Sequence, residues 1–139
     1  MKVRHALVLA AALAAASVPA GAEQPAGTLA ECSKRHSDPA QWATCIRLAQ
    51  RQASDDMLDA FATTQQWVRA IGGVDGELAA ALTESQRDFE RYVQGQCTFV
   101  HALFARAGVA DLAALACETD LLLQRTAVLR SAADSGTRK

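Results

Sequence analysis

Four cysteines restrict the fold of this chain more than any other feature, because they are few, even in number and widely spaced: Cys32, Cys45, Cys97 and Cys117. Structural zinc sites draw on cysteines about two to four residues apart, and no such pair occurs here. An even number of cysteines in a small exported protein is typical of disulfides. We therefore expect two cross-links, with reduced or metal-bound thiols as the alternative.

The start of the chain indicates export. Residues 1–22 have the parts of a secretory signal peptide: a basic start, an apolar run over 6–18, and the small residues Ala-Gly-Ala over 20–22. The apolar run is shorter than the about 20 residues that span a bilayer, which disfavours a retained membrane anchor. We expect cleavage after Ala22 and a periplasmic or secreted protein with no membrane contact.

The charge balance narrows the class of partner. The chain carries 14 Lys and Arg against 15 Asp and Glu, and two of the basic residues, Lys2 and Arg4, leave with the signal peptide. The resulting acidity disfavours nucleic acid and anionic membrane surfaces as partners. It is compatible with a basic protein as the partner.

The mature chain begins with an expected irregular lead-in over 23–37, followed by a helix that Asp38 can cap and Pro39 can start. Apolar residues then recur every three or four positions, which is typical of a helix with one buried face. The helix is long, so a bend or break is allowed near 54–56. Its expected buried stripe contains Trp42, Ile46, Ala49, Ala53, Met57, Phe61, Thr64, Val68 and Ile71.

Two more helical segments follow. One begins near Asp75 and ends at Gly108, and the other runs from about Asp111 to Ala133. Gly95 lies inside the first of them at a cost of about 1 kcal/mol relative to alanine, which the close approach of another helix would explain. A local kink at Gly95 is the alternative. The buried stripe expected for this segment includes Leu78, Leu82, Gln86, Phe89, Val93, Val100 and Phe104.

These patterns predict an all-α fold, because no segment alternates apolar and polar residues with the period of a strand. We expect one domain over 38–134, a small antiparallel bundle of three or four helices stapled by two disulfides. Residues 135–139 are expected to fray.

The expected helices favour one cysteine pairing. Cys97 and Cys117 lie ten residues on either side of Ala107, where the last turn is expected. With the same rise per residue in both helices, the two cysteines come level in an antiparallel hairpin. Cys32 then pairs with Cys45, and each bond would contribute about 3 kcal/mol.

The mature chain offers little for catalysis. His36 and His101 have no serine or free cysteine beside them in a nucleophile motif, so both are interpreted as surface residues. The glycines between the first two helices follow no strand, so they make no nucleotide-binding fingerprint. We expect no enzyme activity, no cofactor and no metal.

A candidate contact surface lies on the first helix. Asp55, Asp56 and Asp59 cluster there, and the first and last of them share a face, which would suit a cationic partner. A plain solvated helix face is the alternative. Trp67 and Tyr92 are expected at the edges of the buried stripes, where an aromatic side chain with a polar tip suits contact with a partner.

The sequence also resembles that of a known protein family. Gln86, Arg87, Phe89, Tyr92 and Cys97 keep an order and spacing that resembles the signature of the LprI-like lysozyme inhibitors, which are small exported helical proteins. The downstream part is similar to the closing part of that family: Cys117, Arg125 and Leu129.

The chain also departs from that family pattern. Phe89 stands where the family usually has Trp, and Val93-Gln94 replaces an Arg-Asp pair. Asp59 stands where an asparagine is usual, and Phe61 comes one position early. If the Arg-Asp pair binds the partner, this chain lacks that contact. If the pair only stabilises the bundle, Val93 can replace it by packing.

The resemblance implies inhibition of lysozyme or another cell-wall hydrolase by occlusion of its cleft, and an acidic rigid surface would suit a strongly basic lysozyme. The first alternative is a periplasmic structural, stress or immunity-type interaction protein with no lysozyme target. The second is an enzyme that uses His36 or His101. The sequence does not set the oligomeric state.

Overall fold

The computed structural model describes residues 27–71 and 76–137, and these fold into helices joined by short turns. The predicted all-α class with two disulfides is confirmed. The predicted signal peptide over 1–22 lies outside the described residues. In chain order the elements are α1 Thr28–Arg35, α2 Pro39–Ile71, α3 Glu77–Phe104, the 3-10 helix η1 Ala105–Ala107, and α4 Ala110–Thr137.

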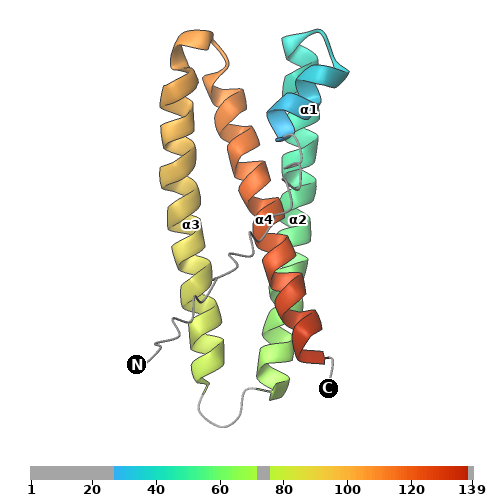
Figure 1. Ribbon diagram of the computed structural model, residues 1–139, viewed down its shortest axis with the longest axis vertical. Helices are drawn as coiled ribbons and strands as arrows, with labels where there is room; N and C mark the ends of the chain where they lie inside the picture. The colour runs from blue at the N-terminus through green and yellow to red at the C-terminus, as the bar shows by residue number, and fades with distance from the viewer. Residues whose placement is uncertain (1–26, 72–75, 138–139) are drawn as a thin grey trace, which may run out of the picture.

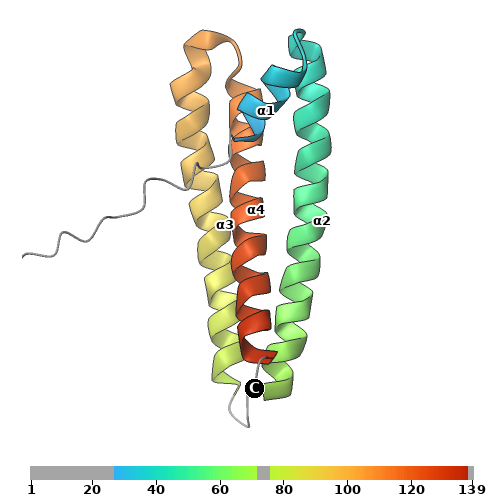
Figure 2. The ribbon, with the colours of Figure 1, turned by 45° about the vertical axis from the view of Figure 1, so that its right-hand side comes forward.

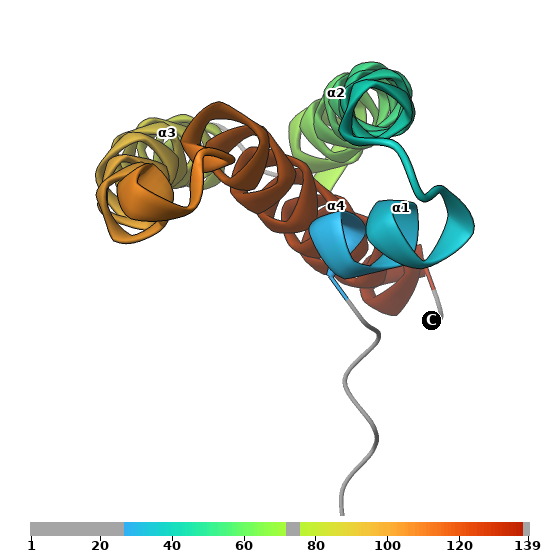
Figure 3. The ribbon, with the colours of Figure 1, turned by 90° about the horizontal axis from the view of Figure 1, so that it is seen from above.

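Helix α4 is the centre of the fold. Figure 2 shows α2 on one side of α4 and α3 on the other, and consecutive long helices run antiparallel (Figures 1 and 2). Seen from above, the three long helices form a bent row, and α1 lies against α4 and α2 (Figure 3). Helices α2 and α3 contact each other far less than each contacts α4. The fold is therefore an open arrangement in which α3 is covered on one side only.

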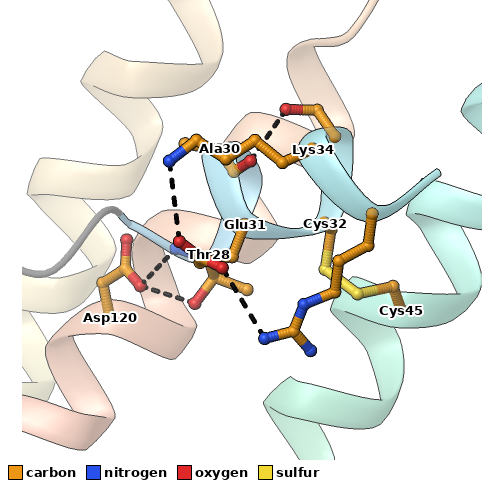
Figure 4. A network of polar contacts seen from close by, with 9 residues as sticks. Thr28, Ala30, Glu31, Cys32, Lys34, Cys45 and Asp120 are labelled. Atoms are coloured by element: carbon orange, nitrogen blue, oxygen red, sulfur yellow. Dashed lines mark hydrogen bonds and ion pairs between the residues drawn. A yellow bond between two sulfur atoms is a disulfide. The ribbon is translucent and has the colours of Figure 1, made fainter. Parts of the chain in front are cut away.

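The prediction of an irregular lead-in over 23–37 is wrong from Thr28 onward, because α1 forms there. An isolated helix of this length is marginal, so tertiary contacts must hold it. The backbone N–H and the hydroxyl of Thr28 donate to Oδ1 of Asp120 on α4, at 2.9 and 2.5 Å (Figure 4). A Cβ at Gly27 would come within 2.7 Å of Asp120 Oδ2, so the carboxylate fits against this glycine. The cap comes from a distant residue, which local sequence patterns do not reveal.

We expect Asp120→Ala to lower the free energy of unfolding by about 1–2 kcal/mol, because it removes the acceptor at the start of α1. Urea denaturation followed by circular dichroism measures this change. Asp55→Ala, on an exposed part of α2, is the matched control and should change stability by less than about 0.5 kcal/mol. Equal effects of the two substitutions would contradict the capping role.

Helix α2 is one continuous helix, so the break allowed near 54–56 does not occur. Its start is as predicted: the N–H of Ala40 donates to Asp38 Oδ1 at 3.0 Å. One buried face continues past the expected break and keeps the helix on α4, whereas Ile71, predicted in this stripe, is 52 % exposed. The buried residues of α2 are Ile46, Ala53, Ala60, Thr64 and Val68.

The buried face of α4 is built mainly from small side chains, which let α2 approach closely. The hydroxyl of Thr64 lies 2.8 Å from the carbonyl oxygen of Ala60 on its own helix and 3.2 Å from that of Leu129 on α4. Helix α4 continues to Thr137, so the first three residues of the segment 135–139, where we expect fraying, are helical. The buried residues of α4 are Ala113, Ala116, Thr119, Leu122, Thr126, Leu129 and Ala133.

Helix α3 buries little. Gln86 and Cys97 are its buried residues, while Leu78, predicted in the core stripe, is 42 % exposed. Gly95 is exposed, and a Cβ built there meets nothing within 4 Å. The expectation that another helix of this chain approaches Gly95 is therefore wrong for the described residues.

We expect Gly95→Ala to raise the free energy of unfolding of the monomer by about 1 kcal/mol, because alanine fits the helix interior at no steric cost. Gly108→Ala is the contrasting variant: its φ of +71° is strained for alanine and should cost about 1 kcal/mol. Thermal unfolding of both variants checks the pair. A loss of stability in Gly95→Ala would contradict the open space seen around this residue.

Candidate functional site

Two disulfides each tie a pair of neighbouring helices together. Cys32 bonds to Cys45 and joins α1 to α2, with Cα atoms 5.8 Å apart (Figure 4). Cys97 bonds to Cys117 and joins α3 to α4, with Cα atoms 5.6 Å apart. The predicted pairing is confirmed, and no cysteine of the described residues is free.

A polar cluster joins the N-terminal half of α3 to α4. The guanidinium of Arg125 on α4 donates from Nε to Oε1 of Gln86 at 3.2 Å and from Nη2 to the hydroxyl of Ser85 at 3.1 Å. Its central carbon lies 5.5 Å from the ring centroid of Phe89. Burial lowers the pKa of Arg125, although an arginine stays protonated at neutral pH. The buried amide of Gln86 also donates to Glu90 Oε1 at 3.2 Å, so this cluster is a fully bonded helix contact.

The residues of the family motif fall into two groups, those in the contact between α3 and α4 and those that are exposed. Gln86, Phe89 and Arg125 meet in the cluster between α3 and α4, which gives them a structural role. Arg87 is exposed, and its guanidinium lies 3.7 Å from the carboxylate of Glu84. Tyr92 is 55 % exposed and lines a hollow shared by α1, α3 and α4.

The structure does not gather the candidate contact residues of α2 into one patch. Asp55 and Asp59 are exposed, but Asp56 accepts a hydrogen bond at 3.3 Å from Arg130 on α4, which offsets its charge. Trp67 is half-buried and lies about 18 Å further along the helix than Asp55, from the rise of 1.5 Å per residue. The candidate surface is therefore reduced to two carboxylates.

A more acidic surface, which sequence analysis did not find, lies in the groove between α3 and α4. This groove has a volume of about 550 Å³, and its carboxylates are those of Glu90, Asp111 and Glu118, with no Lys or Arg among its lining residues. Glu118 Oε1 also accepts from Gln50 of α2 at 3.4 Å. The lining residues are Glu90, Val93, Gln94, Cys97, Thr98, His101, Asp111, Ala114, Leu115 and Glu118.

The histidines lie apart from each other. His101 Nε2 lies 3.0 Å from Asp111 Oδ1 at the rim of this groove. His36 lines a separate hollow between α1 and α2. In the part of the chain that the structure describes, no three His, Cys, Asp or Glu side chains are placed to hold a metal ion. No described helix is both long enough and apolar enough to cross a membrane.

A family model with the description "Lysozyme inhibitor LprI" matches residues 32–129. The chain belongs to the LprI lysozyme inhibitor family. The match begins at Cys32, includes all four cysteines, and extends beyond the contact between Gln86 and Arg125. Comparison with curated proteins and with solved structures finds no match to this chain.

In this LprI chain, the departure from the family signature lies in the acidic groove. Val93 and Gln94, which replace the Arg-Asp pair, both line it beside Glu90. Valine and glutamine are uncharged, so neither adds a charge there. Because the usual pair has one positive and one negative charge, its replacement leaves the sum of charges unchanged, and the acidity of the groove comes from Glu90, Asp111 and Glu118.

The residues that line the acidic groove follow a sequence pattern that can be recognised once the groove is known. Glu90, Gln94 and His101 recur at helical spacing along one side of α3, and Asp111, Leu115 and Glu118 do so along α4. Each series alone is indistinguishable from an ordinary solvated face. The two series face each other only once α3 packs on α4, where the disulfide and the cluster around Arg125 join the two helices.

Proposed function

We propose that this LprI-family protein acts outside the cytoplasm by binding lysozyme or a related cell-wall hydrolase and occluding its cleft. The observation that carries this proposal is the family match over residues 32–129, which spans both disulfides. A cross-linked body suits such a role, because a surface that is already ordered loses little conformational entropy on binding.

The acidic groove is the surface that we propose to face the hydrolase. A group of carboxylates with no Lys or Arg among the lining residues attracts a basic protein and raises the rate of association. The exposed pair Asp55 and Asp59 on α2 is the second acidic surface and remains a candidate contact. The two surfaces lie on different helices and can be changed separately.

The test of the function is a titration of purified, oxidised protein against lysozymes of several types. The proposal predicts a saturable loss of hydrolase activity that is complete near equal molar amounts with at least one type. Undiminished activity of every type at a large excess of the protein would refute it. A different partner recovered from periplasm in a pull-down would then favour the interaction protein without a lysozyme target.

The binding surface can be tested with isosteric charge changes. We expect the double variant Glu90→Gln and Glu118→Gln to raise the inhibition constant about tenfold at low ionic strength and much less at high salt, where charges are screened. Glutamine keeps an oxygen that can accept from Gln86 or Gln50, so the fold should be unaffected. Inhibition kinetics at two salt concentrations give the measurement.

The matched control is the double variant Asp55→Asn and Asp59→Asn, which removes the same charge from α2. The proposal predicts a change of less than about twofold in its inhibition constant. A larger loss for the α2 variant than for the groove variant would assign the contact to α2 instead. Comparable inhibition by both variants and the wild type would exclude carboxylates of either surface from the contact.

A further inference from the structure

The side of α3 that points away from α4 is an exposed face with a regular pattern. We define the outer face of α3 as the positions that follow each other at spacings of three or four residues, opposite Gln86 and Cys97. All of them are exposed. They are Glu84, Asp88, Arg91, Gly95, Phe99 and Ala102, and Arg106 of η1 continues the series.

Large apolar side chains lie on and beside this face: Phe99 belongs to it, while Leu103 and Tyr92, which also lines the hollow shared by α1, α3 and α4, flank it. Tyr92, Phe99 and Leu103 are 55, 60 and 65 % exposed and lie within twelve residues of one helix. A single exposed apolar residue is ordinary, but such a cluster on one helix marks an interaction surface. Aromatic side chains are also the type most enriched at protein interfaces.

Gly95 lies at the centre of the outer face. Glycine in an exposed helix interior is unfavourable, and no described atom of the chain approaches its Cβ position. A glycine flanked by Tyr92 and Phe99 gives a second helix room to approach the backbone. This is a second observation, independent of the apolar cluster, that favours a helix as the occupant of the face.

The charges of the outer face are arranged so that it complements itself. Glu84 precedes Gly95 by eleven residues, and Arg106 follows it by eleven. Tyr92 precedes Gly95 by three, and Phe99 follows it by four. An antiparallel copy of the same helix, centred on Gly95, therefore sets Glu84 level with Arg106 and brings Tyr92 within one residue of the level of Phe99.

We propose that the outer face of α3 is the interface of a homodimer, in which α3 of a second copy lies antiparallel across a twofold axis at Gly95. A twofold interface uses the same patch on both subunits, so self-complementarity is its requirement. A strongly basic partner would instead favour a face of one charge, whereas this face has both acidic and basic residues. The acidic pair Asp55 and Asp59 on α2 lies on a different helix and stays free.

The decisive experiment uses two complementary charge variants of the full mature, oxidised protein in sedimentation velocity over a dilution series. The wild type should be dimeric, and Glu84→Arg or Arg106→Glu alone should raise the dimer dissociation constant about tenfold, because symmetry makes two repulsive pairs. Mixing the two variants should restore the wild-type constant, since both pairs in the mixed dimer are again opposite in charge. Arg51→Glu, on α2, is the control and should leave the constant unchanged.

Substitutions of Gly95 distinguish a role in the dimer interface from a role in the helix alone. Gly95→Ala should stabilise the fold and yet weaken the dimer, whereas Gly95→Leu should abolish the dimer while the circular dichroism spectrum stays helical. A wild type that is monomeric throughout the dilution series would overturn the proposal. So would a dimer whose constant is unchanged in all these variants, since its interface would then lie elsewhere.

Discussion

Replacing Cys97 and Cys117 together with serine is expected to lower the free energy of unfolding by about 3 kcal/mol. The cross-link closes a loop of 20 residues, and its loss restores conformational freedom to the unfolded chain. The effect should be concentrated in α3, because this helix buries only Gln86 and Cys97 among its described side chains. Urea denaturation gives the overall change, and hydrogen exchange of the α3 amides shows where it falls.

The matched comparison is serine at both Cys32 and Cys45, which opens a loop of 13 residues and should cost a similar amount, about 3 kcal/mol. In this variant, hydrogen exchange of the α1 amides should become faster, and the α3 amides should stay protected. If α3 stays equally protected in both double variants, the disulfide to α4 is not what holds α3 in place.

Ile46→Ala is expected to lower the free energy of unfolding by about 3–4 kcal/mol, within the range for large cavities in a core. The side chain of Ile46 is 0 % exposed and packs with Cys32 and Ala116, where α1, α2 and α4 meet. Because Ile46 is fully buried among three helices, its truncation leaves a cavity that the surrounding side chains fill only in part. Thermal and urea unfolding measure the loss.

The control for Ile46 is Leu48→Ala on the same helix, whose side chain is 59 % exposed. Its stability should change by less than about 0.5 kcal/mol. A loss at Ile46 no larger than that at Leu48 would mean that the contact of α1, α2 and α4 is not the core of the fold.

The long helices and the disulfides were predictable from the sequence, because both depend on spacing along the chain. Helix α1 was not, since its cap is Asp120, far away in sequence. The extent of burial was not predictable either. The apolar stripe of α3 shows which side turns inward, but Leu78 is left exposed because α3 packs mainly on α4 and has few contacts with α2.

The candidate site was less predictable than the fold, because charges are paired between elements. Asp56 was expected in an acidic patch, yet Arg130 lies beside it, contributed by a helix 74 residues later. The acidic groove needs Glu90 and Glu118 on two helices at one level, which only the packed structure provides. The roles of Gln86 and Arg125 likewise became clear once their contact was seen.

The claim that this protein occludes a hydrolase cleft is tested most directly by initial rates of an inhibited lysozyme over a range of substrate concentrations. Occlusion predicts that the apparent KM of the lysozyme rises linearly with the concentration of the oxidised protein while kcat is unchanged, because substrate and inhibitor then exclude each other. A fall in kcat at constant KM would place the contact away from the cleft and contradict the account.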